Sequence, residues 1–233
     1  MRREAYVGEW LPEPLVADSA ADPARQAELA DSLSLAFLVL LESLSPDQRA
    51  ALLLRDVFDY DYAQIADIVG KSEDNARQLA ARARRHVEER RPRFEASREQ
   101  RNELAQRFFE AAREGELDAL ENLLAHDVVL HGDGGGKVPA LARAVHGRER
   151  VARTLRAWMR QGDRILGAAL RPIDVNGQPG ALLLAGEDVV IGVMALDIAD
   201  GQIQEVRSIV NPDKLGHIGE VGDMRALLKG PGA

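Results

Sequence analysis

The order of helical and strand-like segments limits the possible folds of this chain more than any other feature. Up to about residue 125 the sequence favours helices, whereas the stretch from about 166 to 210 holds four apolar runs separated by turn sequences. The runs are 168–175, 181–185, 189–198 and 203–210, with Asn176-Gly177, Gly186-Glu187-Asp188 and Asp200-Gly201 between them. Helices followed by antiparallel strands predict two domains, first all-α and then α+β.

The boundaries follow from changes in composition. Residues 1–22 contain two prolines and several acids without a helical period, which indicates a linker. Residues 23–95 form the predicted all-α domain. It has a first helix to about Leu44, a second that Ser45-Pro46-Asp47 starts and that runs to about Phe58, and a third from Tyr62 to Val69. Apolar residues recur at helical spacing in the first of these helices: Leu29, Leu33, Ala36, Phe37 and Leu40.

Residues 96–233 form the predicted α+β domain. It should begin with a helical segment over 97–125 that Gly115 divides and that carries Phe108 and Phe109 on one side. A strand at 128–130, a glycine turn at 134–136 and a helix over 148–161 should follow.

Composition excludes several classes of protein. The chain has no cysteine, which excludes disulfides and thiolate metal sites, and its five histidines lack metal-ligand spacing, so we expect no metal or cofactor. The N-terminus lacks the apolar core of a signal peptide, and the longest apolar run, 35–41, is too short to cross a membrane. We therefore expect a cytoplasmic protein with no membrane segment and a buried helix at 35–41.

A basic stretch at 71–93 interrupts an otherwise acidic chain, whose formal net charge is −8. It has eight basic residues against four acidic ones, which is typical of a confined phosphate-binding surface, although a solvated charged helix has the same composition. The basic residues are Lys71, Arg77, Arg82, Arg84, Arg85, Arg90, Arg91 and Arg93.

The residues around this stretch meet the steric demands of a helix-turn-helix. Ala66 is small where two helices would cross, Gly70 can end the first helix in the left-handed conformation, and Ser72 can cap the second. One face of the second helix should be buried, with Ala76, Ala80, Ala83 and Val87. The opposite face should meet DNA in the major groove, where arginine pairs with guanine and glutamine with adenine. The predicted DNA-binding residues are Lys71, Ser72, Arg77, Gln78, Arg82 and Arg85. A helical hairpin with a charged outer face is the alternative.

Several segments resemble region 4 of extracytoplasmic-function sigma factors. They are Leu44-Ser-Pro-Asp-Gln-Arg49, Leu53-Leu-Arg-Asp-Val57, Tyr62-Ala-Gln-Ile-Ala66, Asn75-Ala-Arg-Gln-Leu79 and Arg82-Ala-Arg84. The resemblance implies that this domain reads the minus-35 element of promoter DNA and that RNA polymerase core is a partner. Region 2 of the family, which melts the minus-10 element, has no counterpart in this sequence, so we expect that the chain is a fragment and cannot start transcription by itself.

Three further motifs resemble sigma factors of the SigJ type. They are Trp10-Leu11-Pro12-Glu13-Pro14, Asp133-Gly134-Gly135-Gly136-Lys137 and Asn211-Pro212-Asp213-Lys214-Leu215. The resemblance implies a SnoaL-like, NTF2-like domain with a cone-shaped sheet that regulates the sigma factor in cis, and assigns interdomain or regulatory roles to these residues.

The chemistry of the three motifs gives its own expectations. A tryptophan in a linker usually finds a surface to bury against, and glycines at 134–136 let the backbone take positive φ and approach a partner closely. Pro212 should end the last strand and leave Asp213 and Lys214 exposed. A phosphate-binding P-loop would need a Lys-Ser/Thr pair, but Val138 follows Lys137.

Two other functions remain open from the sequence. The α+β domain could take up a small apolar ligand and change the domain arrangement. It could also be an enzyme of the cyclase or isomerase type, because His131 and Asp133 alternate on a strand and should point to the same side. Catalysis is the weaker interpretation, because the glycine motif already accounts for Asp133.

Overall fold

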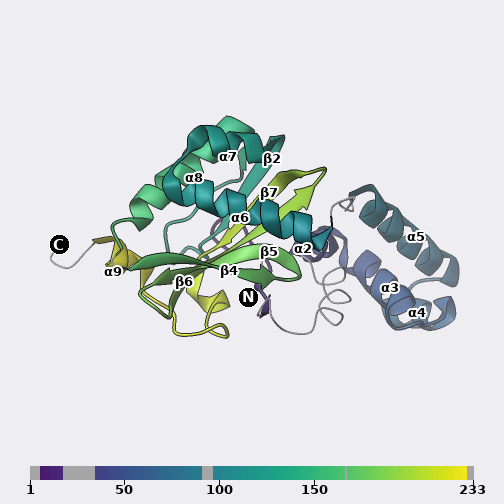
Figure 1. Ribbon diagram of the computed structural model, residues 1–233. Coiled ribbons are helices and arrows are strands. Elements are labelled where there is room, and N and C mark those ends of the chain that lie inside the picture. Colours follow the sequence, from purple (N-terminus) through teal and green to yellow (C-terminus); the bar gives the residue numbers. More distant parts are fainter. Residues whose placement is uncertain (1–5, 18–34, 91–96, 166, 230–233) are drawn as a thin grey trace. The chain divides into compact units, whose positions relative to one another are not determined.

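The computed structural model describes residues 6–17, 35–90, 97–165 and 167–229 (Figure 1). Contacts between them define two compact units. The helical unit lies within residues 36–92, and the C-terminal unit combines the described residues before 36 with those from 97 onward. The linker residues 6–17 therefore belong to the C-terminal unit.

The described residues of the helical unit form the helices α2 (Leu35–Ser43), α3 (Pro46–Asp56), α4 (Tyr62–Val69) and α5 (Glu73–Arg90). Ser45 starts α3 with a capping box, in which its hydroxyl accepts from the Gln48 amide, as the sequence predicts. Asp61 and Gln64 form the same box at α4. The predicted helix over 23–34 lies outside the described residues, and Leu40 and Leu41 of the apolar run are buried.

A seven-stranded sheet forms the centre of the C-terminal unit. Its spatial order is β1-β4-β5-β6-β7-β2-β3. The strands are β1 (Val16–Ala17), β2 (Leu124–Asp133), β3 (Val145–His146), β4 (Ala168–Val175), β5 (Gln178–Ala185), β6 (Val189–Ala199) and β7 (Gln202–Ile209). The four predicted strands correspond to β4 through β7. They pair antiparallel in the order of the sequence, as expected, whereas β2 runs parallel to β7. One helix and four strands separate β2 from β7 in the chain, which provides the long crossover that a parallel pair needs.

Helices α6 (Arg98–Glu114), α7 (Leu117–Leu123) and α8 (Arg148–Gly162) cover one face of this sheet (Figure 1). Gly115 ends α6 in the left-handed conformation, as predicted, with φ of 73°. The predicted helix end at 125 is wrong by two residues, because β2 already begins at Leu124. Phe108 and Phe109 of α6 pack into the core against the inner face of the sheet.

Two short helices follow the sheet, the 3-10 helix η2 (Pro212–Lys214) and α9 (Met224–Lys229). Among the described residues, no helix has the length and apolar character needed to cross a membrane.

Candidate functional site

Helices α4 and α5 form the helix-turn-helix that the sequence predicts. Gly70 adopts the left-handed conformation with φ of 65°, and its amide donates to the Ala66 carbonyl. The Ser72 hydroxyl accepts from the Asn75 amide at 3.3 Å, which caps α5. Ala66 is buried at 6% exposure, in a cluster with Ile65. Ala66, Gly70 and Ser72 therefore have the structural roles that the sequence predicts.

The two faces of α5 also separate as predicted. Ala76, Ala80 and Ala83 are fully buried and Val87 is half-buried. The predicted DNA-binding residues are all exposed: Lys71, Ser72, Arg77, Gln78, Arg82 and Arg85.

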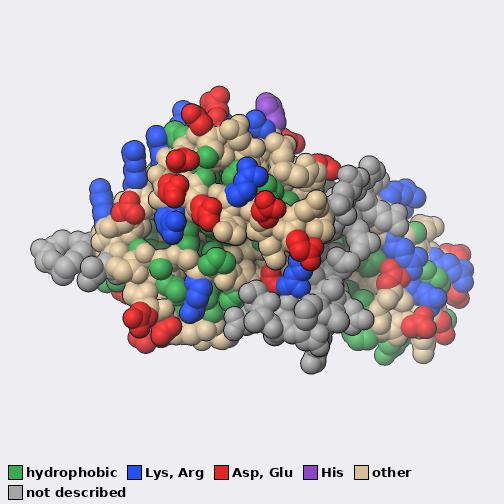
Figure 2. Space-filling model, viewed as in Figure 1, with side chains coloured by type: hydrophobic (Ala, Val, Ile, Leu, Met, Phe, Trp, Pro, Cys, Tyr) green, Lys and Arg blue, Asp and Glu red, His purple; other side chains and the backbone are tan. Residues whose placement is uncertain are grey.

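Intramolecular ion pairs distinguish the basic residues of this unit from one another. Arg77 pairs with Glu73 and lies 5.4 Å from the centre of the Tyr62 ring. Arg84 forms a bidentate pair with Asp56, and hydrogen bonding to this carboxylate raises the pKa of Arg84. Arg84 therefore joins α5 to α3. Basic and acidic side chains accordingly lie next to one another on this unit (Figure 2).

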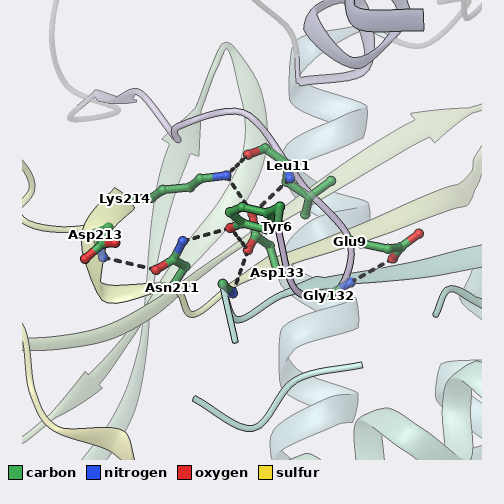
Figure 3. Close-up of polar contacts among 9 residues, drawn as sticks. Tyr6, Glu9, Leu11, Gly132, Asp133, Asn211, Asp213 and Lys214 are labelled. Carbon is green, nitrogen blue, oxygen red and sulfur yellow. Dashed lines mark hydrogen bonds and ion pairs between the residues drawn. The ribbon is translucent and has the colours of Figure 1, made fainter. Parts of the chain in front are cut away.

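In the C-terminal unit, the buried carboxylate of Asp133 at the end of β2 binds the linker (Figure 3). Its Oδ2 accepts from the backbone amide of Leu11 at 2.9 Å, and its Oδ1 accepts from the hydroxyl of Tyr6. The Gly135 amide donates to Oδ1 at 3.0 Å. Asn211 donates to the Tyr6 hydroxyl at 2.8 Å. We call Asp133, Gly135, Asn211 and Lys214 the linker anchor.

Lys214 is buried at 7% exposure, so the expectation that it is exposed is wrong. Its Nζ lies 2.7 Å from Asp133 Oδ2, donates to the Leu11 carbonyl, and stands 5.0 Å and 4.5 Å from the ring centres of Tyr6 and Trp10. A carboxylate, a carbonyl and two aromatic faces compensate for the loss of water around this ammonium group. Asp213, in contrast, is exposed as predicted and pairs with Lys137 at 2.6 Å.

The glycine motif fits closely between the linker and the Asn211 segment. Gly135 has φ of 58°, and a Cβ there would lie 2.5 Å from Asn211 Cγ. Gly136 has φ of 72°, and a Cβ there would lie 2.8 Å from Val7 Cβ. Side chains at either position would collide with these neighbours, which explains why the loop needs glycines.

The linker buries Leu11 more deeply than the tryptophan that the sequence singles out. Leu11 is 3% exposed, Pro12 and Pro14 are buried, Glu13 is exposed and Trp10 is half-buried. Further along, the Pro14 carbonyl accepts from His217 Nε2 at 2.8 Å, and Val16–Ala17 extend the sheet as β1 beside β4. Leu215, in the last of the three motifs, is fully buried.

Sequence reasoning missed a second polar contact with the linker. Glu9 lies 3.1 Å from His131 Nδ1, and Glu205 lies 3.5 Å from His131 Nε2. Burial alone would lower the pKa of His131, but the two carboxylates outweigh it and raise the pKa above the ordinary value. Burial likewise opposes ionisation of Glu205, yet His131 and Arg207 lower its pKa. His131 and Asp133, the pair considered for catalysis, both point to the linker side, and both bind linker residues there.

Comparison with known proteins identifies both units. Residues 34–87 match the model of sigma-70 region 4, and residues 105–206 match that of the SnoaL-like domain. The ECF RNA polymerase sigma factor SigJ of Mycobacterium tuberculosis (strain ATCC 25618 / H37Rv) is 38% identical over 222 residues, which are 91% of this chain and 71% of that protein. This chain belongs to the extracytoplasmic-function sigma factors.

Two further comparisons agree with this family. The probable ECF RNA polymerase sigma factor SigI of M. tuberculosis (strain CDC 1551 / Oshkosh) is 33% identical over 199 residues, 84% of this chain and 64% of that protein. The crystal structure of M. tuberculosis SigJ matches this sigma factor with a TM-score of 0.71 and 36% identity, over 91% of this chain and 76% of that chain. The predicted combination of region 4 with a SnoaL-like domain, of the SigJ type, is confirmed.

Proposed function

We propose that the helical unit binds the minus-35 element of promoter DNA through the exposed face of α5. The match to sigma-70 region 4 supports this function, and so does the separation of buried alanines from exposed basic side chains along α5. The capped N-terminus of α5, at Ser72, favours a DNA phosphate. Within the described residues, Arg82 and Arg85 form no ion pair, whereas Arg77 and Arg84 are each paired with a carboxylate.

Promoter affinity of single variants tests this assignment. Arg82→Ala should weaken binding of a minus-35 duplex by about 1 to 3 kcal/mol if Arg82 contacts a base. Arg77→Ala should cost less than Arg82→Ala, because Arg77 must first leave Glu73. Fluorescence anisotropy at fixed moderate salt measures both, and unchanged binding by both variants would refute the role of α5.

The same unit offers a surface for the RNA polymerase core. Val57 and Phe58, directly after α3, are 66% and 64% exposed. Neighbouring large apolar side chains at this exposure favour contact with another protein. We infer that they contribute to binding the polymerase core, and Phe58→Ser should weaken that binding without changing affinity for the isolated duplex.

We further propose that the SnoaL-like domain regulates the sigma factor in cis by holding the linker. The observation that carries this proposal is the linker anchor, in which the buried Asp133 accepts hydrogen bonds from two linker residues and one loop glycine. Such an anchor fixes the described linker residues 6–17 on the SnoaL-like domain. Releasing it changes the positions that region 4 can adopt, and thus its availability to DNA and polymerase.

Asp133→Asn in the whole chain tests regulation, with Asp213→Asn as the matched control. Asp213 carries the same charge as Asp133 but pairs with Lys137 at the surface. Hydrogen exchange should show release of residues 6–16 in Asp133→Asn only, and promoter or polymerase affinity should change in that variant only. If the linker is released while both affinities stay at the wild-type value, regulation through the linker is wrong.

A further inference from the structure

The C-terminal unit contains an apolar cavity on the inner side of its sheet, the face that helices α6, α7 and α8 cover. The cavity has a volume of about 180 Å³ and lies between the sheet and helices α8 and α9. Apolar side chains dominate its walls, including Trp158, Met159, Leu183, Ile191, Val210 and Leu228. A dry cavity of about 150 Å³ is known to accept benzene. The present cavity therefore encloses about seven non-hydrogen atoms, slightly more than benzene has, and because it is partly open to solvent a chain of about nine can extend from it.

The polar groups of the cavity indicate the charge of its occupant. Arg113, Gln161, Asp163 and Ser208 contribute to the lining. Arg113 and Asp163 have opposite charges and are both exposed to solvent, so neither sign of charge is favoured inside. The side-chain amide of Gln161 and the hydroxyl of Ser208 can bind one uncharged polar group of the ligand. This combination fits a small apolar molecule with a single neutral hydrogen-bonding group, and it disfavours an ion.

The cavity and the linker anchor share the backbone of two strands. Gly132 lines the cavity, while the next residue, Asp133, points to the opposite side and binds the linker. At the end of β7, Val210 lines the cavity and Asn211 belongs to the anchor. The Val210 amide donates to the Asp133 carbonyl at 2.8 Å, which joins the two strand ends.

Two more contacts link the cavity wall to the linker region. The Gly132 amide donates to the carboxylate of Glu9 in the linker at 3.4 Å. Ala140 lines the cavity and packs against the glycine motif, since a Cβ at Gly134 would lie 2.7 Å from Ala140 Cβ. Closely packed interiors transmit small displacements to their neighbours. A molecule that moves Gly132 or Val210 therefore moves the groups that hold the linker.

We propose that this cavity binds a small, neutral, apolar molecule and that its occupancy changes how firmly the linker anchor holds residues 6–17. The geometry of the cavity alone supports the binding site, whereas the regulatory effect of binding rests on the proposed function of the linker. The inner side of the sheet thus receives the molecule, and the outer side responds through adjacent residues of β2 and β7.

Binding of 1-octanol, measured by isothermal titration calorimetry on the whole chain, tests the site. Octanoate provides the charged comparison and should bind about tenfold more weakly or not at all. Ala168→Trp and Leu170→Trp place a large ring on the cavity wall and should weaken octanol binding at least about tenfold. Ala157→Trp is the control, because Ala157 is exposed on α8 and does not line the cavity.

Hydrogen exchange of residues 6–16 with saturating octanol tests the coupling. The expected result is binding to the wild type and the control, loss of binding in both filling variants, and altered linker exchange on binding. Absence of octanol binding to the wild type, or undiminished binding by both filling variants, overturns the site. Binding that leaves linker exchange unchanged overturns the coupling. Failure of the proposed function has a different signature, unchanged promoter and polymerase affinity in Asp133→Asn.

Discussion

Replacing Asp133 should release the linker more completely than replacing its charged partner Lys214. The carboxylate of Asp133 is fully buried and accepts from Tyr6, Leu11, Gly135 and Lys214. In Asp133→Asn the lysine stays buried without its counter-charge. Removing one partner of a buried ion pair costs about 3 to 5 kcal/mol.

Lys214→Met has a smaller expected effect. It removes one donor, but Asp133 keeps two amides and a hydroxyl, which still stabilise its negative charge. A hydrogen bond to a charged group is worth about 1.5 to 3 kcal/mol, and methionine fills most of the space of the lysine stem. The Leu11 carbonyl also loses its bond to Nζ.

Exchange of the Leu11 amide reports the difference directly, because this amide donates to Asp133. Since about 1.4 kcal/mol corresponds to tenfold, its protection should fall about a hundredfold or more in Asp133→Asn and about tenfold to a hundredfold in Lys214→Met. Urea denaturation of each variant separates loosening of the linker from unfolding of the domain. Equal loss of protection in both variants, or none in Asp133→Asn, would refute this account of the anchor.

Three further predictions follow from other contacts. Because the pKa of His131 is raised above 6.5, its ion pair with Glu9 is fully present below pH 6.5 and is lost as the pH rises through the raised pKa. Hydrogen exchange of the linker, corrected for intrinsic rates, should therefore accelerate over that pH range in the wild type. It should not do so in His131→Gln. Gly135→Ala should lower the free energy of unfolding, measured by urea denaturation, by about 1 to 3 kcal/mol. Gly216→Ala is the control, because a Cβ at Gly216 would have no neighbour, and it should change this free energy by less than about 0.5 kcal/mol. Arg84→Ala should lower the melting temperature of the helical unit, whereas Arg82→Ala should leave it unchanged in calorimetry, because only Arg84 is bonded to Asp56.

The helix-turn-helix could be predicted from sequence because its determinants are local. Gly70, Ser72 and the alanines of α5 act within one or two helical turns, so spacing alone reveals their roles. The spacing could not reveal which basic residues are already paired. Arg84 meets Asp56 across 28 residues, and only the packing of α3 against α5 brings them together.

The linker anchor was predictable only through the resemblance of three motifs to a family. Apart from the bond of Gly135 to Asp133, its contacts join residues more than 80 positions apart, such as Lys214 to Asp133 and Asp133 to Leu11. In the sequence, Lys214 lies two residues after Pro212, which is typical of an exposed position. Only the fold brings the carboxylate and the aromatic rings that stabilise the buried ammonium group next to it. Glu9 and His131 lack even a motif, because one acid and one histidine 122 residues apart have no local signal.

The distribution of donors around Asp133 supports the proposed regulation through the anchor. The linker contributes two donors to this carboxylate, and the glycine loop and the segment of η2 contribute one each, so a change at the carboxylate itself affects all four bonds. A single hydrogen bond to a charged group contributes about 1.5 to 3 kcal/mol, which a modest change in packing can offset. Because these bonds share one carboxylate, a displacement of Asp133 itself alters all of them. A displacement of β2 at Gly132, one residue away, therefore affects the whole set at once, whereas separate contacts along the linker would respond one by one.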